Sequence, residues 1–471
     1  MEVSLVRIMR TSARIGILAL LAVGSVAIGI QLGAYTFRQR DPLAGATAAS
    51  EAGSGLGFSN LDELSWSQQP SPLQTMSDVL EMVESEYVEK VDADDKFAVG
   101  AARTMLYTLD DPRTRYWAPD QTALLEQQLD GKFVGIGAVL AVVKEKRDEV
   151  EQRRVCVIAP VPGGPCDAAG VRAGDYITGI DGRWVIAYDP RLDLNRMTLR
   201  TMPEREYREK IKDATKKLQD GISWPRALEQ LTQPTGKPLE LTIERKSAPA
   251  PITVKVTRNE TQVAPVEFHT VAPGTGYLRI TQFTASAPAQ VTSALKTSGR
   301  PARVILDLRD NAGGPDLAGP KSVVSSAAAV LSALGFSGEF GKIARGSSRH
   351  PIASAAQSGS SSGTRPSVAV LINKGTANIA EVAAAYLQAR AGAKLIGAPS
   401  QGDSSYQKLI KLSLGAMTLT AGSYFTVAGK AVPATGLSPD VPVATGGPRW
   451  EKDAAVNKAL ALLGRAQGGR S

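Results

Sequence analysis

The chain has 471 residues, of which 43% are hydrophobic and 21% are charged, so it holds enough apolar material for a globular protein of roughly two to three domains. Its formal net charge is +8, but aromatic residues make up only 5%, so a nucleic-acid partner is not expected. Two cysteines and two histidines are too few for a disulfide scaffold or a spaced metal-ligand cluster. We therefore expect no metal and no cofactor, and Cys156 and Cys166 either pair with each other or remain free thiols.

An apolar run at residues 15–37 follows a cluster of three arginines. At about 1.5 Å per residue, this run is long enough to cross a bilayer. The arginines favour an N-terminus that stays in the cytoplasm. We therefore expect residues 1–40 to be a single-pass membrane anchor and the globular part to be periplasmic or otherwise extracytoplasmic. The small residues Ser25-Val26-Ala27 leave a cleaved signal segment as the alternative.

Residues 41–72 are rich in glycine, alanine, serine and proline and are typical of a flexible linker. From 73 to 130, apolar residues recur at helical spacing in 76–87, 97–109 and 121–129, which predicts a helical N-terminal segment. The sequence Leu109-Asp110-Asp111-Pro112 is a turn signal within it.

Residues 131–257 are rich in predicted strands and contain Gly135-Ile136-Gly137, the turn sequence at 170–175 and the hairpin turn Asp181-Gly182. This order resembles a PDZ domain. The resemblance implies that backbone N–H groups of Gly135, Ile136 and Gly137 bind the terminal carboxylate of a peptide, while the peptide adds a strand to the sheet edge. Glycine suits such a loop because the backbone must come close to its ligand.

A long insertion interrupts this domain at about residues 186–222. Its centre, residues 204–218, is highly charged, and Glu204/Arg208 and Glu206/Lys210 are spaced one helical turn apart. Such pairs stabilise a solvated helix slightly. The insertion is either a surface excursion or a docking element for a partner protein.

Strands and helices alternate in residues 258–445, and a short C-terminal helix and tail occupy 446–471. The buried strand predicted at 303–308 runs into a loop that contains Gly313 and Gly314, and a helix is predicted at about 317–334. Residues 346–365 are dense in serine and glycine, which predicts a mobile loop.

The most informative stretch is 367–407. A short apolar strand at 368–372 is followed by the turn Asn373-Lys374-Gly375 and an alanine-rich helix. Enzymes often mount a nucleophile on such a strand, turn and helix, because the helix N-terminus offers free N–H groups to a developing oxyanion. The exposed position of this turn is predicted to hold Asn378.

About residues 75–465 resemble the carboxyl-terminal processing (tail-specific) serine peptidases. The matching motifs include the turn at 109–112, the Gly-Ile-Gly loop, the loop at 306–314 and the turn at 436–440. The resemblance implies a mixed α+β and α/β multidomain fold: a helical segment, a PDZ domain with a helical insertion, and a crotonase-like α/β peptidase core. The family uses a serine whose proton is taken by a lysine, and that lysine must be buried to act as a base.

The two reactive positions of the family hold other residues in this chain. When the family motifs are laid on the sequence without a gap, Asn378 stands at the serine position and Asp403 at the lysine position. An amide cannot replace an alkoxide, and a carboxylate has the wrong charge to resemble an amine base. The supporting position Gln407 is retained, and Gly313, Gly314 and the N–H of Ile379 match the region that supplies oxyanion donors.

Other groups near the turn are candidates for a displaced nucleophile or base, namely Thr376, Ser404, Ser405 and Lys374. A displacement of about one ångström costs on the order of a hundredfold in rate, so we do not expect rescue. His350 lies in the predicted mobile loop and His269 at a domain junction, so neither suggests a Ser-His-Asp arrangement. A hydrogen bond between the side chains of Asn378 and Asp403 is one way to fill the former dyad space.

The sequence thus predicts a membrane-tethered extracytoplasmic pseudopeptidase that binds protein or peptide C-termini as a scaffold or accessory subunit. One alternative is an active serine-type C-terminal processing endopeptidase with a non-standard nucleophile. The other is a purely structural subunit of a membrane complex.

Overall fold

The computed structural model describes residues 72–88, 93–147, 149–197, 203–233, 236–353, 365–444 and 450–465. The chain divides into two units, residues 1–77 and 78–471, and only the start of α2 (Pro72–Glu86) represents the first unit in these ranges. The predicted membrane anchor and linker lie outside them. Within the described ranges, no helix is long and apolar enough to cross a membrane.

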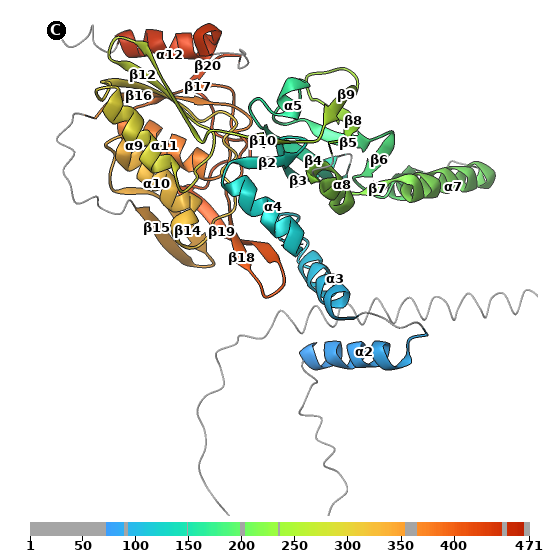
Figure 1. The fold of residues 1–471 in the computed structure, drawn as a ribbon. Helices are drawn as coiled ribbons and strands as arrows, with labels where there is room; N and C mark the ends of the chain where they lie inside the picture. The colour runs from blue at the N-terminus through green and yellow to red at the C-terminus, as the bar shows by residue number, and fades with distance from the viewer. Residues whose placement is uncertain are drawn as a thin grey trace, which may run out of the picture. The chain divides into compact units, whose positions relative to one another are not determined.

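Three helices occupy the predicted helical segment: α2, α3 (Ala93–Tyr107) and α4 (Pro119–Leu129) (Figure 1). Between α3 and α4, the carboxylate of Asp111 accepts hydrogen bonds from the Arg113 N–H and the Thr114 hydroxyl, a local pattern that fixes a turn. The short strand β1 (Arg115–Trp117) then pairs antiparallel with β19 (Ala416–Thr426). This pairing joins the N-terminal segment to the C-terminal half of the chain.

The segment predicted as a PDZ domain is a β-rich body, called here the PDZ-like domain (residues 131–262). Its seven-stranded sheet contains β3 (Ala138–Arg147), β4 (Val150–Pro160), β5 (Tyr176–Ile180), β6 (Arg183–Ile186), β7 (Ile222–Ser223), β8 (Pro238–Glu244) and β9 (Ile252–Thr257). The strands β2 (Lys132–Gly135) and β10 (Asn259–Gln262) form a separate pair, and the helices are α5 (Pro165–Ala168) and α8 (Trp224–Thr232). Burial alternates along β8, so one face of the sheet packs on Leu228 and Leu231 of α8 in a single core.

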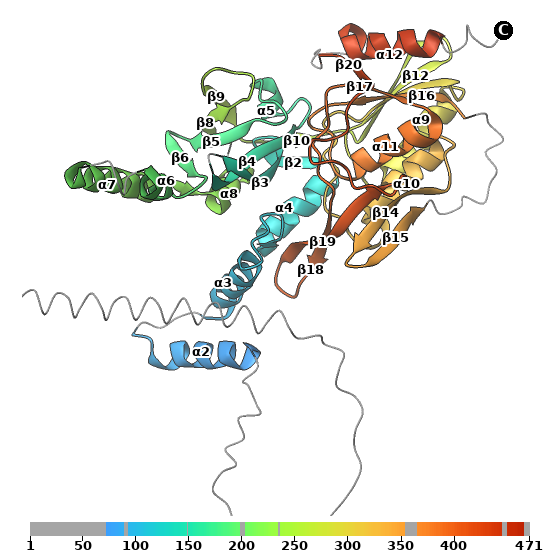
Figure 2. The ribbon, with the colours of Figure 1, turned by 180° about the vertical axis from the view of Figure 1, so that it is seen from behind.

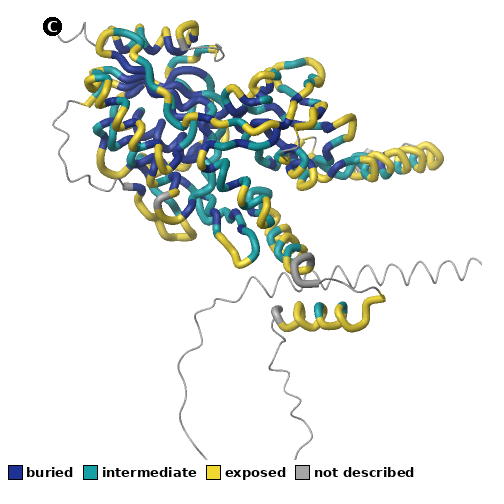
Figure 3. Tube along the Cα trace, viewed as in Figure 1, coloured by how far each residue is buried: buried dark blue, intermediate teal, exposed yellow. Residues whose placement is uncertain are grey.

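The insertion forms α6 (Arg191–Met197) and α7 (Glu204–Asp220). Along α7 only Ala214 is buried, and Figure 3 shows the helix exposed over most of its length. The two predicted ion pairs are confirmed: Glu204 lies 2.5 Å from Arg208 and Glu206 lies 3.0 Å from Lys210. These pairs are worth only about 0.3–0.5 kcal/mol each, so α7 is a solvated helix.

The core of the C-terminal half is a six-stranded sheet in the order β11-β12-β13-β16-β17-β20. Its strands are β11 (Val266–Ala272), β12 (Thr275–Ile280), β13 (Arg303–Asp307), β16 (Ser367–Ile372), β17 (Lys394–Gly397) and β20 (Val441–Pro442). All neighbouring pairs are parallel except β11 with β12. The inner strands β12, β13, β16 and β17 are buried over most of their length, as is usual when helices cover both sides of a parallel sheet.

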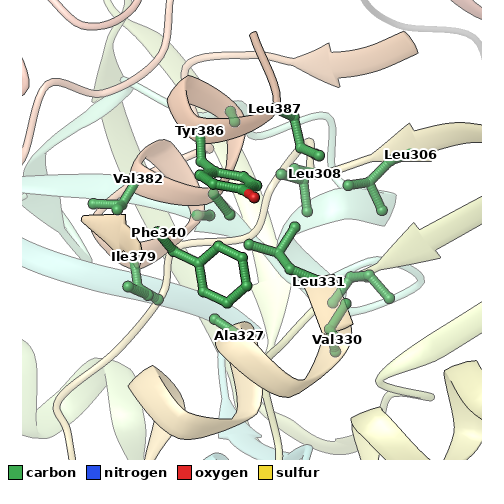
Figure 4. Close-up of a cluster of buried hydrophobic side chains, with 14 of the residues drawn as sticks. Leu306, Leu308, Ala327, Val330, Leu331, Phe340, Ile379, Val382, Tyr386 and Leu387 are labelled. Atoms are coloured by element: carbon green, nitrogen blue, oxygen red, sulfur yellow. The ribbon is translucent and has the colours of Figure 1, made fainter. Parts of the chain in front are cut away.

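Two helical layers cover this sheet, as Figures 1 and 2 show. Val368, Val370 and Ile372 of β16 pack with α9 (Ala287–Thr297), α10 (Val323–Ala333) and α11 (Ile379–Ala391). The alternate residues Ala369 and Leu371 pack with α12 (Ala454–Arg465) on the other face. The period of two along the strand therefore sorts its side chains into two cores. Figure 4 shows the larger core, where Phe340 and Tyr386 meet edge to face at 4.6 Å between ring centres.

A buried ion pair fixes α12 to the sheet. Arg309, just after β13, contacts Asp307 at 2.5 Å and Asp453 at 2.5 Å. Asp453 also accepts a hydrogen bond from the Ala455 N–H at the start of α12. The guanidinium and both carboxylates are almost fully buried, so each charge depends on its partner.

A second sheet contains β1, β14 (Glu339–Arg345), β15 (Ser348–Ala353), β18 (Ser405–Lys411) and β19. The prediction of a mobile loop from residue 346 onward is wrong for 348–353, because these residues pair with β14 as β15; residues 354–364 lie outside the described ranges. The helix predicted at 317–334 begins later, at Val323, since a short 3-10 turn occupies Gly319–Lys321. The expected mixed α/β multidomain fold is confirmed.

Candidate functional site

The candidate site lies where β16 turns into α11. The Thr376 hydroxyl donates to the Leu308 carbonyl at 2.8 Å and accepts from the Asn373 N–H at 3.1 Å. The side chain of Asn373 makes two hydrogen bonds with Asp310: its Oδ1 accepts from the Asp310 N–H, and its Nδ2 donates to the Asp310 carboxylate. The turn is therefore tied to the loop after the neighbouring strand β13, and the Thr376 hydroxyl has a structural role.

Asn378 occupies the sharpest point of the turn, with φ +59° and ψ −127°. Residues other than glycine rarely adopt this conformation, and where they do it is held in place by surrounding contacts. The prediction that this position is exposed is wrong, because the residue is only 6% exposed, and its Oδ1 is buried without a hydrogen-bond partner. A strained turn of this kind is how a strand-to-helix junction presents a nucleophile, and here it presents an amide.

Glu381 holds the site together. Its carboxylate is fully buried and accepts hydrogen bonds from the Ser400 hydroxyl at 2.5 Å and from the N–H groups of Gly402, Asp403 and Asn378 at 2.7, 3.0 and 2.9 Å. Burial raises the pKa of this carboxyl to about 7, and the four donors oppose that shift. The N–H groups of Asn378 and Asp403 both donate to Oε2, so the two backbone nitrogens lie within about 6 Å of each other.

The carboxylate of Asp403 contacts groups other than Asn378. Its Oδ1 accepts from the N–H of Ser405 at 3.0 Å and from the Ser405 hydroxyl at 2.7 Å, and it lies 3.4 Å from the guanidinium of Arg113. In the part of the chain that the structure describes, the side chains of Asn378 and Asp403 make no hydrogen bond with each other. The negative charge at this position is instead matched by an arginine from the turn before β1.

Only some of the N–H groups that the sequence matched to oxyanion donors are free to bind an acceptor. The N–H of Gly313 already donates to Asn311 Oδ1 at 3.0 Å. A Cβ at position 313 would lie 2.7 Å from the Cβ of Asn378 and 3.3 Å from the nitrogen of Ile379, which explains why a glycine stands there. The N–H groups of Gly314 and Ile379 have no partner among the described residues. Two of the three predicted donors thus remain open to an acceptor.

Other candidate groups lie on the turn and on the surrounding strands. The Lys374 ammonium donates to the carbonyls of Ser400 and Gln401 at 3.2 and 3.0 Å, and partial burial lowers its pKa. Gln407 lies on β18, where its carbonyl accepts from the Asp316 N–H at 2.8 Å. His350 lies in β15 and His269 in β11, where its ring contacts Glu267. Among the described residues, neither hydrogen bond of the Lys374 amine joins it to a hydroxyl in the manner of a base and its nucleophile.

The PDZ-like domain covers the turn. Ala377 packs against Cys156 and Ile158 of β4, and alternate residues of β3, including Val139 and Ala141, border the same cluster. Cys156 and Cys166 are both free and buried, and burial raises the pKa of each thiol to about 12. The outer face of the PDZ-like sheet therefore covers Ala377, the residue next to Asn378.

The predicted carboxylate-binding loop is also partly occupied. The N–H of Ile136 donates to the Leu231 carbonyl of α8 at 3.0 Å, and a Cβ at Gly135 would lie 2.3 Å from that oxygen. The N–H of Gly137 has no partner among the described residues. Strand β3, which begins directly after this loop, pairs with β4 alone in the described sheet and so leaves one edge open.

Sequence reasoning missed three residues of this site: Glu381, Ser400 and Arg113. Glu381 follows Asn378 by three residues, the spacing of a capping box, and this was the available signal. Ser400 and Arg113 come from distant segments, so no local pattern marks them.

Comparison with known proteins shows what this chain is similar to. Residues 274–443 match the model of peptidase family S41. The chain is 28% identical over 378 residues to a carboxy-terminal-processing protease of Bartonella bacilliformis, covering 79% of this chain and 75% of that protein. It is also 28% identical to a chloroplastic C-terminal processing peptidase of Tetradesmus obliquus, covering 72% of this chain and 67% of that protein.

Among solved structures, a photosystem II D1 C-terminal processing protease superposes with a TM-score of 0.56 at 23% identity, over 83% of this chain and 97% of that one. This likeness concerns the fold. Together, the matches relate the chain to the S41 peptidases. The relatives named above are C-terminal processing proteases, and the chain is similar to them.

Proposed function

We propose that this chain is a pseudopeptidase of the C-terminal processing protease family, which binds the C-termini of proteins or peptides without hydrolysing them. The proposal is carried by one observation: the turn that would present the serine presents Asn378, and Asp403 occupies the position of the lysine base. The nitrogen lone pair of an amide is delocalised into its carbonyl, so Asn378 does not attack a peptide bond.

Three of the four candidate groups near the turn, Thr376, Ser405 and Lys374, are engaged in hydrogen bonds, which supports the proposal. The hydroxyls of Thr376 and Ser405 donate to a carbonyl and a carboxylate, respectively, and the Lys374 amine donates to two carbonyls. Activating any of them requires breaking these bonds and moving the group toward the oxyanion donors. A misplacement of about one ångström already costs on the order of a hundredfold in rate.

Peptide binding is proposed for the PDZ-like domain. The open edge of β3 offers backbone groups to an added strand, and the unpartnered N–H of Gly137 lies at the start of that strand. An extended peptide that adds to such an edge gains main-chain hydrogen bonds, and its terminal carboxylate is matched by free N–H groups. On the sequence pattern of residues 15–37, we further propose that the chain is tethered to a membrane with its globular part outside the cytoplasm.

The absence of hydrolysis is tested with a serine-directed fluorophosphonate probe and an unstructured protein substrate. The wild-type protein is expected to react with neither. Labelling and cleavage that Ser404→Ala or Ser405→Ala abolishes would overturn the proposal and establish a displaced nucleophile. The double variant Asn378→Ser with Asp403→Lys is a matched test of the scaffold, and we expect it to gain measurable cleavage.

Binding is tested by fluorescence anisotropy with a peptide that has a free C-terminal carboxylate and the same peptide as its C-terminal amide. The free acid is expected to bind at least about tenfold more tightly, since charge-assisted hydrogen bonds to N–H groups are lost in the amide. Gly137→Val is expected to abolish the difference, with a folded circular dichroism spectrum as its control. Equal binding of both peptides, or none, would favour a purely structural subunit.

A further inference from the structure

The backbone conformation of Asn378 aligns the nitrogen of Ile379 with the Cβ of Asn378. The other three substituents of Cα, namely its nitrogen, Cβ and hydrogen, are spaced about 120° apart when viewed along the Cα–C bond. At ψ −127°, the nitrogen of Ile379 is therefore nearly eclipsed with the Cβ of Asn378. In a regular helix or strand, ψ is about −42° or +135°, and the same nitrogen lies well away from the side chain.

This eclipsed arrangement is the one that a five-membered ring requires. The ring would contain the Ile379 nitrogen and four carbons of Asn378: the carbonyl carbon, Cα, Cβ and Cγ. Ring closure needs the torsion between the Ile379 nitrogen and Cβ to be near zero, and the folded backbone already supplies it. Only rotation about the Cα–Cβ bond remains to bring Cγ to the nitrogen.

The reacting groups are also not held by other bonds. The Ile379 N–H has no partner among the described residues, and Asn378 Oδ1 is buried without a partner. The surrounding structure fixes the strained backbone instead, through the hydrogen bond from the Asn378 N–H to Glu381 at 2.9 Å. The eclipsed ψ of −127° is strained in the open form, whereas the closed ring requires this torsion.

We propose that Asn378 is a site of spontaneous intramolecular modification, at which the side chain cyclises to a succinimide. The Ile379 nitrogen attacks Cγ of Asn378, and a new C–N bond forms. The bond from Cγ to Nδ2 breaks, and Nδ2 leaves as ammonia with the proton lost by the Ile379 nitrogen. Water later adds to either ring carbonyl and opens the imide to aspartate or to a β-linked isoaspartate.

Burial determines how long the ring persists. Asn378 is 6% exposed, and the PDZ-like sheet packs on the preceding residue, Ala377. Ring closure consumes no water, whereas ring opening does. We therefore infer that the imide accumulates in the folded protein before it is hydrolysed.

Two other asparagines near the turn provide matched controls within the same molecule. Asn311 uses both ends of its amide, donating to the Ile280 carbonyl and accepting from the Gly313 N–H. Asn373 likewise bonds Asp310 through both ends of its amide. Cyclisation at either position breaks these hydrogen bonds, so both side chains are expected to remain intact while Asn378 reacts.

The experiment ages purified full-length protein in mildly alkaline buffer and follows its peptides by mass spectrometry after digestion at acidic pH. The Asn378 peptide is expected to lose the mass of ammonia at least about tenfold faster in folded protein than in protein unfolded in urea, since preorganisation is lost on unfolding. Equal rates in the two states, or faster loss at Asn311 or Asn373, would overturn the proposal. Asn378→Gln, which would have to form a larger ring, is expected to remain unmodified at this position.

Discussion

The hydrogen-bonded scaffold of the candidate site differs from Asn378 and Asp403, the two residues at its reactive positions. The difference lies in how completely their polar groups are hydrogen-bonded within the scaffold. Glu381 accepts four hydrogen bonds, and Thr376 and Asn373 bond to the adjoining loop. Asn378 leaves Oδ1 without a partner, and Asp403 turns toward Ser405 and Arg113. Stability is therefore expected to depend on the scaffold, whereas the proposed loss of hydrolysis depends on Asn378 and Asp403.

The first test removes the centre of the scaffold. Glu381→Ala would leave four buried donors without an acceptor, so we expect the free energy of unfolding to fall by about 3–5 kcal/mol, measured by urea denaturation. The matched control is Glu339→Ala, which removes a partly exposed carboxylate 3.5 Å from Lys342 and should cost less than about 0.5 kcal/mol. Equal losses in the two variants would contradict the role given to Glu381.

The second test titrates the same group. Burial raises the pKa of Glu381 from 4.5 to about 7 in the folded state, so the folded protein holds this proton over a pH range in which the unfolded chain has lost it. The contribution of this proton to the free energy of unfolding is fully present below pH 4.5 and is lost as pH rises through about 7. The change in the free energy of unfolding is on the order of 2–3 kcal/mol. Urea denaturation across this range should show the loss, and Glu381→Gln, which does not titrate, should lack this component. An unchanged pH dependence in Glu381→Gln would contradict the assignment.

The third test relieves the strain at the reactive position. Asn378→Gly should raise the free energy of unfolding by up to about 1 kcal/mol, because glycine adopts a positive φ without steric cost. The matched control is Asp310→Gly at φ +61°; its carboxylate bonds Asn373, so this variant should lose stability. A loss of stability in Asn378→Gly would mean that the amide contributes a contact that outweighs the strain.

The smallest effect is expected for the ion pair between Arg113 and Asp403. Their side chains are 35% and 21% exposed, so a double-mutant cycle with alanine at each position should give a coupling of only about 0.2–1 kcal/mol. The coupling should fall at high salt. A coupling of several kcal/mol would show that Asp403 has become part of the scaffold rather than a replaced residue at its edge.

Much of this site could be predicted from local sequence patterns. The apolar run of β16, the Asn373-Lys374-Gly375 turn and the alanine-rich helix specify strand, turn and helix within a short stretch of chain. The motif alignment also brought positions 378 and 403 together, and their N–H groups do share Oε2 of Glu381.

Contacts between distant segments could not be predicted in the same way. Arg113 and Asp403 are far apart in sequence, and so are Ala377 and the PDZ-like residues that pack on it. The serine- and glycine-rich composition at 346–365 suggested a loop, but pairing with β14 supplied the hydrogen bonds that make 348–353 a strand. Tertiary context outweighed local propensity there.

The buried pairing of Arg309 with Asp453 has a consequence for the order of synthesis. Arg309 lies in the loop that continues to Gly313, whereas Asp453 begins the last described helix. Because the chain leaves the ribosome from its N-terminus, the Arg309 guanidinium can pair with Asp453 only after α12 has emerged. The loop beside Asn378 therefore completes its contacts only after residue 453 has been translated.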